Sequence, residues 1–201
     1  IALFLPLIRA QFGLTFTQAG MLAAAATLTY AVMQIPAGVI ADRYSPKLVF
    51  SIGILGANLL AIAFALSDSF VVMLVTQAVG GVFRALMFIP GMVLITRHFS
   101  HARRATALGL FVAGGFSSNI VVNLAGPLLV EPLGWQGVIL LSSALGLVVL
   151  GAFWLLADDG PPHAAGAHRP SRWVWRTAAW WLLGVIQFSR LWIVAGFAFW
   201  L

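Results

Sequence analysis

The amino-acid sequence predicts an all-α fold, specifically a polytopic integral membrane helical bundle. Apolar residues make up 62% of the 201 positions and charged residues only 8%, whereas a soluble domain carries roughly 25% charged residues. Each of four charge-free stretches is long enough to cross about 30 Å of hydrocarbon as a helix. They cover residues 10–41, 48–67, 105–130 and 132–157. The expected partner is therefore a lipid bilayer, which the chain crosses several times.

The composition excludes several classes of function. A net charge of +6 comes from only 11 basic residues spread along a mostly apolar chain, so we expect no nucleic-acid partner. Cysteine is absent, which removes disulfide bonds, thiolate nucleophiles and thiolate metal sites. No motif for a cofactor or a metal stands out, and we expect neither.

Charged and turn-forming residues place the expected helices. The apolar segment at residues 1–8 is predicted to be the end of a first helix. Further helices are predicted at about 17–41, 47–66, 70–97, 105–130 and 135–156. Thr17 is the expected N-cap of the second helix, and Pro46 suits the first turn of the third. Residues 157–172 read as a linker, and a seventh helix starts at about Trp173. We interpret residues 1–156 as one transmembrane half and 173–201 as the truncated start of another, the remainder of which is missing.

Basic residues predict the orientation, because cytoplasmic loops accumulate lysine and arginine. Alternate loops place eight basic residues on one side: Arg43, Lys47, Arg97, Arg103, Arg104, Arg169, Arg172 and Arg176. The other side holds Arg9 alone. We therefore expect the N-terminus and the linker to be cytoplasmic, and the protein to lie in the plasma (inner) membrane. Trp135, Trp154, Trp173 and Trp175 are expected near the two interfaces.

Polar residues are shared unevenly among the expected spans. The third and sixth helices carry few and could face lipid, whereas the second, fourth, fifth and seventh carry polar stripes at helical spacing. Either these stripes form hydrogen bonds between helices or they surround a polar solute. The candidate substrate-binding residues are Arg84, Arg190, Gln77, Gln187, Tyr30, Gln34, Asn119 and Asn123.

Arg84 and Arg190 are the two arginines that fall within expected spans. An arginine at the bilayer centre costs roughly 3 kcal/mol even on a lenient insertion scale, so it needs a partner or a water-filled cavity. All five acidic residues lie at expected helix ends or in loops. Three interpretations stay open: the arginines bind an anionic substrate, pair with a carboxylate elsewhere in the protein, or extend to an interface.

The loop after the second expected helix carries a motif. Gly38, Asp42, Arg43 and Lys47 resemble the G-x-x-x-D-R-x-G-R-K signature of the major facilitator superfamily of transporters, with Ser45 and Pro46 as departures. The segments 103–109 and 132–135 resemble that family's entries to its fifth and sixth helices. Two signatures fail: Gln77 stands where the family usually has arginine, and Gly126-Pro127 keeps only the core of the exchanger motif.

The resemblance implies a fold and a function. It implies a twelve-helix permease, a secondary active transporter of a small solute that works by alternating access, with a coupling ion as a further partner. The motif implies a conformational gate, for which the candidates are Gly38, Asp42, Arg43, Lys47 and Arg97. The buried arginines favour an organic or inorganic anion as substrate.

Two alternatives stay open. The first is a membrane-embedded enzyme that acts on lipid, whose candidate groups would be Asp158, Asp159, His98 and His101. The second is a transporter of a neutral solute or drug in which Arg84 is structural. Catalysis is the weaker interpretation, because these groups do not form a metal-ligand or acid–base pattern.

The topology can be tested directly in the cysteine-free chain. Single cysteines at Ser45, Ser100 and Ala165 should react with an impermeant thiol reagent only from the cytoplasmic side, and a cysteine at Ser67 only from the outside. Labelling of Ser45 and Ser67 positions from the same face would contradict the number of spans.

Overall fold

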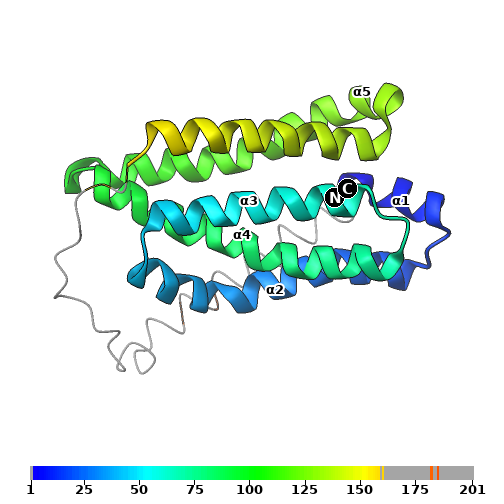
Figure 1. Ribbon diagram of the computed structural model, residues 1–201, viewed down its shortest axis with the longest axis horizontal. Coiled ribbons are helices and arrows are strands. Elements are labelled where there is room, and N and C mark those ends of the chain that lie inside the picture. Colours follow the sequence, from blue (N-terminus) through cyan, green and yellow to red (C-terminus); the bar gives the residue numbers. More distant parts are fainter. Residues whose placement is uncertain (1, 159, 161–181, 183–184, 186–201) are drawn as a thin grey trace. The chain divides into compact units, whose positions relative to one another are not determined.

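The computed structural model describes residues 2–158, 160, 182 and 185, and the chain divides into two compact units, 1–162 and 163–201. The first unit is described here. Its elements are a 3-10 helix η1 (Ala2–Phe4) and the α-helices α1 (Leu5–Phe12), α2 (Phe16–Arg43), α3 (Pro46–Ala65), α4 (Phe70–His98) and α5 (His101–Leu156) (Figure 1). The all-α prediction is confirmed, and four of these helices are long and apolar enough to cross a membrane.

The N-terminus of α2 differs from the expected one by two residues. Thr15, not Thr17, caps the helix: its hydroxyl accepts the Gln18 backbone N–H at 3.2 Å, and the Gln18 side chain accepts the Thr15 backbone N–H at 2.9 Å. This reciprocal capping box satisfies donors that the first turn leaves open. Thr17 lies inside the helix because Thr15 supplies the better-placed pair.

The short connection to α3 explains both departures from the transporter signature. Ser45 occupies the N-cap, where its side chain accepts the Leu48 backbone N–H at 3.1 Å, and Pro46 begins the helix. Proline suits this first position because its missing N–H would have no partner there. Serine and proline therefore replace a glycine turn with a capped helix start.

The expected loop between the fifth and sixth spans is a kink in α5. The helix is continuous from His101 to Leu156 except at Gly134, whose φ of 67° and ψ of 169° leave the helical region. A positive φ favours glycine, since it lacks a Cβ. At this point the chain reverses, so that residues 135–156 run back in the opposite direction to residues 101–133 (Figure 1). We call these segments the first and second limbs of α5.

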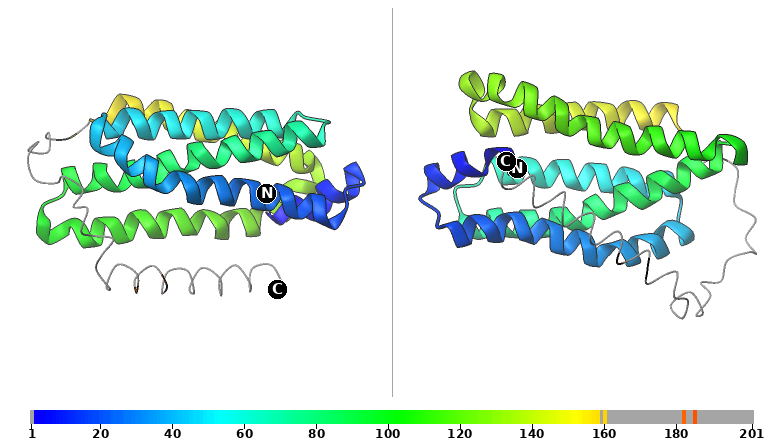
Figure 2. Two further views of the ribbon diagram at one scale, coloured as in Figure 1. Left: turned by 90° about the horizontal axis from the view of Figure 1, so that it is seen from below. Right: turned by 180° about the vertical axis from the view of Figure 1, so that it is seen from behind.

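The long helices run side by side, as the two views in Figure 2 show. α4 packs along both α2 and α3 and more briefly against α5, while α3 also packs against α5. We call the end that holds Arg43, Lys47, Arg97, Arg103 and Arg104 the basic end, and the other the opposite end. A buried cluster that includes Ile8, Leu22, Phe64 and Met73 lies between α1, α2, α3 and α4.

Trp135 lies within this cluster and not in an exposed interfacial belt. Its side chain is 4% exposed, its ring meets Phe12 and Phe64 edge to face, and its Nε1–H donates to Gln11 Oε1 at 2.6 Å. Burial of indole is favourable here because the polar N–H has a partner. Trp135 is therefore buried within the bundle, while Trp154 is 49% exposed.

Glycines allow the helices to approach closely. A Cβ on Gly81 would collide with the Thr29 hydroxyl and the Ala26 carbonyl oxygen of α2. A Cβ on Gly53 would lie 2.9 Å from backbone atoms of Phe83 and Leu86 in α4. Within hydrocarbon, such close backbone contact replaces the hydrophobic effect as a source of helix association.

Gly81→Ala should therefore destabilise the bundle. Overpacking against backbone atoms costs about 1–3 kcal/mol, since α2 and α4 must move apart. The measurement is the apparent Tm in detergent. Gly80→Ala is the matched control, because a Cβ there would meet nothing within 4 Å. Equal melting temperatures for the two variants would show that the α2–α4 contact does not depend on Gly81.

Candidate functional site

Arg84 lies at the middle of α4. It is the fifteenth of the 29 residues between Phe70 and His98, so a helical rise of 1.5 Å per residue places it about 21 Å from either end. Its side chain is exposed, although Ala85 and Leu86 beside it are buried. Among the described residues, Arg84 forms no hydrogen bond and no ion pair. Its charge is thus available to a group outside the described part.

The crossing of α2 and α4 brings Tyr30 to the level of Arg84. Gly81, less than one turn before Arg84, lies against α2, where a Cβ on it would be 3.0 Å from the Tyr30 backbone nitrogen. Tyr30 is half-buried beside the cluster of Ala37, Val49, Ala85 and Leu86. Gln34 is also half-buried and follows one turn later on α2. These residues share one region of the bundle.

Other predicted substrate-binding residues have different positions. Gln77 is 4% exposed and belongs to the packed interior, whereas Asn123 on the first limb of α5 is exposed. The side chain of Asn119, and the whole of Gln187 and Arg190, lie outside the described residues. The structure therefore places Tyr30 near the level of Arg84 along the bundle, with Gln34 one turn further on α2, and it separates Gln77 from the exposed surface.

The predicted gate lies at the basic end. Asp42 and Arg43 are exposed, and neither forms an ion pair among the described residues. Gly38 makes no close helix contact within this unit, because a Cβ there would meet nothing within 4 Å. Arg97 is half-buried, and its Nε is buried without a hydrogen-bond partner. The outward-facing members of the motif are thus available to another part of the protein.

Lys47 has a structural contact that the motif did not predict. Its Nζ donates to the carbonyl oxygens of Trp154 at 2.9 Å and Ala157 at 2.6 Å, and lies 4.7 Å from the centroid of the Trp154 ring. A cation is favourable at a helix C-terminus, where carbonyl groups lack partners. Lys47 therefore caps the second limb of α5 and joins it to α3.

A second charged contact lies beside this cap. His98 Nε2 is 2.5 Å from Asp158 Oδ1, and Asp158 also accepts the Gly160 backbone N–H at 2.9 Å. Two hydrogen bonds lower the pKa of Asp158 below its ordinary value: the larger effect comes from His98 and the smaller from the Gly160 backbone N–H. In the described part of the chain, no three histidine or acidic residues come together to hold a metal ion. His98 and Asp158 pair with each other instead.

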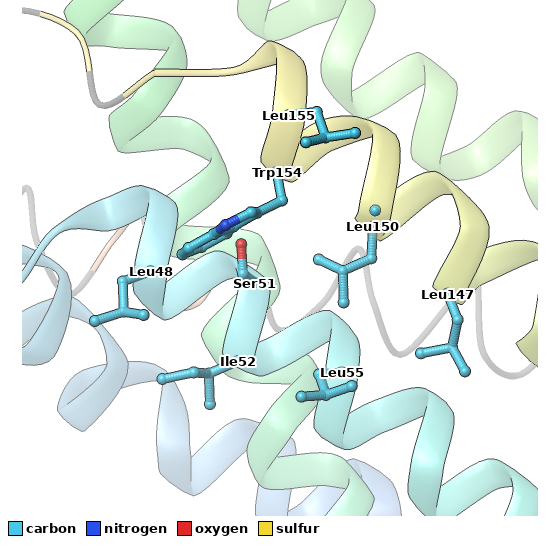
Figure 3. A pocket seen from close by; sticks show the side chains of 9 residues that line it. Leu48, Ser51, Ile52, Leu55, Leu147, Leu150, Trp154 and Leu155 are labelled. Atoms are coloured by element: carbon cyan, nitrogen blue, oxygen red, sulfur yellow. The ribbon is translucent and has the colours of Figure 1, made fainter.

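A groove of about 610 Å³ lies between α3 and the second limb of α5 (Figure 3). Its walls are apolar except for Ser51, and its lining residues are Leu48, Ser51, Ile52, Leu55, Leu147, Leu150, Gly151, Trp154 and Leu155. None of the predicted substrate-binding residues lines it. A polar solute needs convergent polar groups, so this groove is not the candidate site.

The matches to known proteins decide the family. The family model described as the Major Facilitator Superfamily matches residues 1–201. The chain belongs to the major facilitator superfamily. It is an integral, multi-pass membrane protein of a transporter family, as the apolar helices also indicate. The resemblance stated from the Gly38–Lys47 motif is confirmed.

Relatives within the superfamily are named for different substrates. The D-galactonate transporter of Escherichia coli is 26% identical over 144 residues, which cover 70% of this chain and 33% of the relative. The tetracenomycin C resistance and export protein of Streptomyces glaucescens is 29% identical over 132 residues, which cover 66% of this chain and 24% of the relative. The chain spans about a third or less of the length of these curated relatives.

A solved structure agrees with the fold. A bacterial homologue of the human lysosomal transporter Spinster superposes with a TM-score of 0.66 at 20% sequence identity. The match covers 86% of this chain and 42% of the solved chain. The arrangement of helices is therefore that of a superfamily transporter over most of the chain.

Proposed function

We propose that this chain is part of a secondary active transporter that carries a small organic or inorganic anion by alternating access, with Arg84 binding the anionic group. The observation that carries the proposal is an exposed arginine at the middle of a membrane-spanning helix, without a hydrogen bond or ion pair among the described residues. A guanidinium group in this environment favours a carboxylate or phosphate, which it can bind with two parallel hydrogen bonds.

The depth of Arg84 argues against extension to an interface. The side chain is much shorter than the roughly 21 Å that separates its Cα from either end of α4. The remaining alternatives are a solute anion and a carboxylate in another part of the protein. Galactonate, named for one relative, is a carboxylate and supports the first alternative, whereas the relative named for tetracenomycin export does not.

Tyr30 and Gln34 offer neutral hydrogen-bonding groups on α2, the helix that contacts Gly81 one turn before Arg84. We assign them to orientation of the solute, with Arg84 providing the charge. Asn119 and Asn123 on α5, and Gln187 and Arg190 further along the chain, remain proposed members of the same site. Among the described residues, no acid lies on α2 or α4 at the level of Arg84, so the arrangement favours solute binding over a lipid-modifying enzyme.

The substrate proposal is tested on the full-length transporter in proteoliposomes. Arg84→Lys keeps the charge but loses the planar fork, and should weaken binding of a carboxylate solute such as galactonate by at least about fivefold. Arg84→Gln removes the charge and should weaken binding by at least about tenfold, since hydrogen bonds to charged groups contribute roughly 1.5–3 kcal/mol. Equilibrium binding across a panel of organic anions, neutral sugars and cations provides the measurement.

Arg103→Gln is the matched control for loss of one positive charge, because Arg103 is exposed at the basic end and outside the site. It should bind the anion normally. Transport of only neutral or cationic solutes, or normal anion binding by Arg84→Gln, would assign Arg84 to a structural ion pair elsewhere in the protein.

The gate proposal concerns Asp42. We propose that its exposed carboxylate stabilises one conformational state by contacting a facing part of the transporter at the cytoplasmic side. Asp42→Asn should therefore slow transport and change inward versus outward accessibility, without lowering membrane insertion. Asp68→Asn, which removes an exposed carboxylate at the opposite end, is the control. Normal transport and accessibility in Asp42→Asn would refute the gate.

A further inference from the structure

We propose that His98 forms a pH-sensitive tether: its protonated ring holds Asp158 and Gly160, at the start of the linker, on the end of α4 and releases them when the proton is lost. The tether joins two segments 60 residues apart in the sequence. It is independent of the proposed substrate, because it lies at the basic end and not near Arg84.

The first argument is the hydrogen-bonding geometry of the ring. His98 Nδ1 is 2.8 Å from the Leu94 carbonyl oxygen, and Nε2 is 2.5 Å from Asp158 Oδ1. A carbonyl oxygen and a carboxylate oxygen only accept hydrogen bonds. Neutral imidazole has one N–H donor, so only imidazolium can donate to both oxygens. With an ionised Asp158 carboxylate, the two contacts are both hydrogen bonds only when His98 is in the charged form.

The second argument is the shape of the chain around the ring. Gly160 has a φ of 67°, and a Cβ on it would lie 3.0 Å from His98 Cε1 and 3.2 Å from Arg97 Cβ. Its backbone N–H donates to the same Asp158 oxygen that faces His98. A residue without a Cβ thus lets the linker fold against the imidazole, while Asp158 closes the turn.

The surrounding charges determine the direction of the response. The pair is flanked by Lys47 from α3 and by Arg97 from α4, while the last turn of α5 supplies the apolar residues Phe153 and Leu156. His101, Arg103 and Arg104 follow in the first turn of α5. Asp158, whose pKa is lowered, stays ionised as the pH falls through the mildly acidic range. The tether is therefore released as the pH rises, because His98 loses its proton while Asp158 stays ionised.

The pair is suited to sensing because water reaches it. The His98 and Asp158 side chains are 37% and 83% exposed, so the ring exchanges protons with the solution. Exposed ion pairs are weak, and deprotonation consequently shifts a population of linker conformations instead of unfolding the bundle. On the orientation predicted from the basic residues, the tether responds to cytoplasmic pH and acts where the linker leaves the first six helices.

The test uses a spin label, which avoids the pH dependence of thiol chemistry. In the full-length protein with any cysteine outside this chain replaced, a single label at Ala164, beyond the tethered residues and beyond the Lys47 cap, reports mobility of the linker. Histidine changes its charge between mildly acidic and mildly basic pH, so the label is followed from about pH 5.5 to about pH 8.5. The mobile fraction of the label should rise over this range, while a label at Ser100 should show no such change.

Three variants separate protonation from structure. His98→Gln should give a high mobile fraction at every pH, because its side chain carries no titrating charge. His98→Arg should give a low mobile fraction at every pH, since arginine stays charged and retains several donors. His101→Gln, three residues along in the next helix, is the matched control and should keep the pH response of the unaltered protein.

The outcomes decide the inference without a transport assay. A mobile fraction that does not change with pH in the unaltered protein would overturn it. A pH response that survives in His98→Gln, or disappears in His101→Gln, would assign the response to another group. Asp158→Asn provides an independent variant and should also remove the pH response. Failure of the anion proposal at Arg84 would leave all these results unchanged.

Discussion

Close approach of α4 to its neighbours is the constraint on which the bundle depends. Helices in hydrocarbon gain little from burial of apolar surface, so they associate where small residues let backbones meet. Gly81 provides this contact with α2, and Gly53 of α3 provides it with α4. Gly91 lies against Phe50 and Phe111 and accommodates α3 and α5. α4 is therefore the helix that α2 and α3 both pack along.

The same constraint explains the position of Arg84. Because Gly81 and Ala85 occupy the packed face of α4, the long side chain of Arg84 is excluded from that face and extends from the bundle. The contact that brings α2 close also brings Tyr30 to the same level. Packing and the candidate site are thus two consequences of one helix crossing.

Charges at the basic end divide into two groups. Lys47 contacts the end of α5, and His98 contacts Asp158 at the start of the linker. Both residues therefore hold elements of the first unit together. Asp42 and Arg43 are exposed and form no described ion pair. The family motif therefore combines a residue that stabilises this half with residues available for contact elsewhere, although its spacing alone suggested one common role.

Hydropathy and charge in the sequence alone indicated the long apolar helices of the first unit and most of their ends, because a bilayer requires long apolar helices with polar ends. The motif between Gly38 and Lys47 indicated the family. Sequence also singled out Arg84, since an arginine in such a span is unfavourable without a partner. Only the tertiary structure decided which polar residues are accessible: Gln77 is buried and Arg84 exposed, although they lie two turns apart on one helix. It also decided that Trp135 is interior and that Lys47 and His98 meet the end of α5 and the linker start. These contacts join residues more than 50 positions apart, and periodicity along one helix cannot specify which neighbour covers a given face.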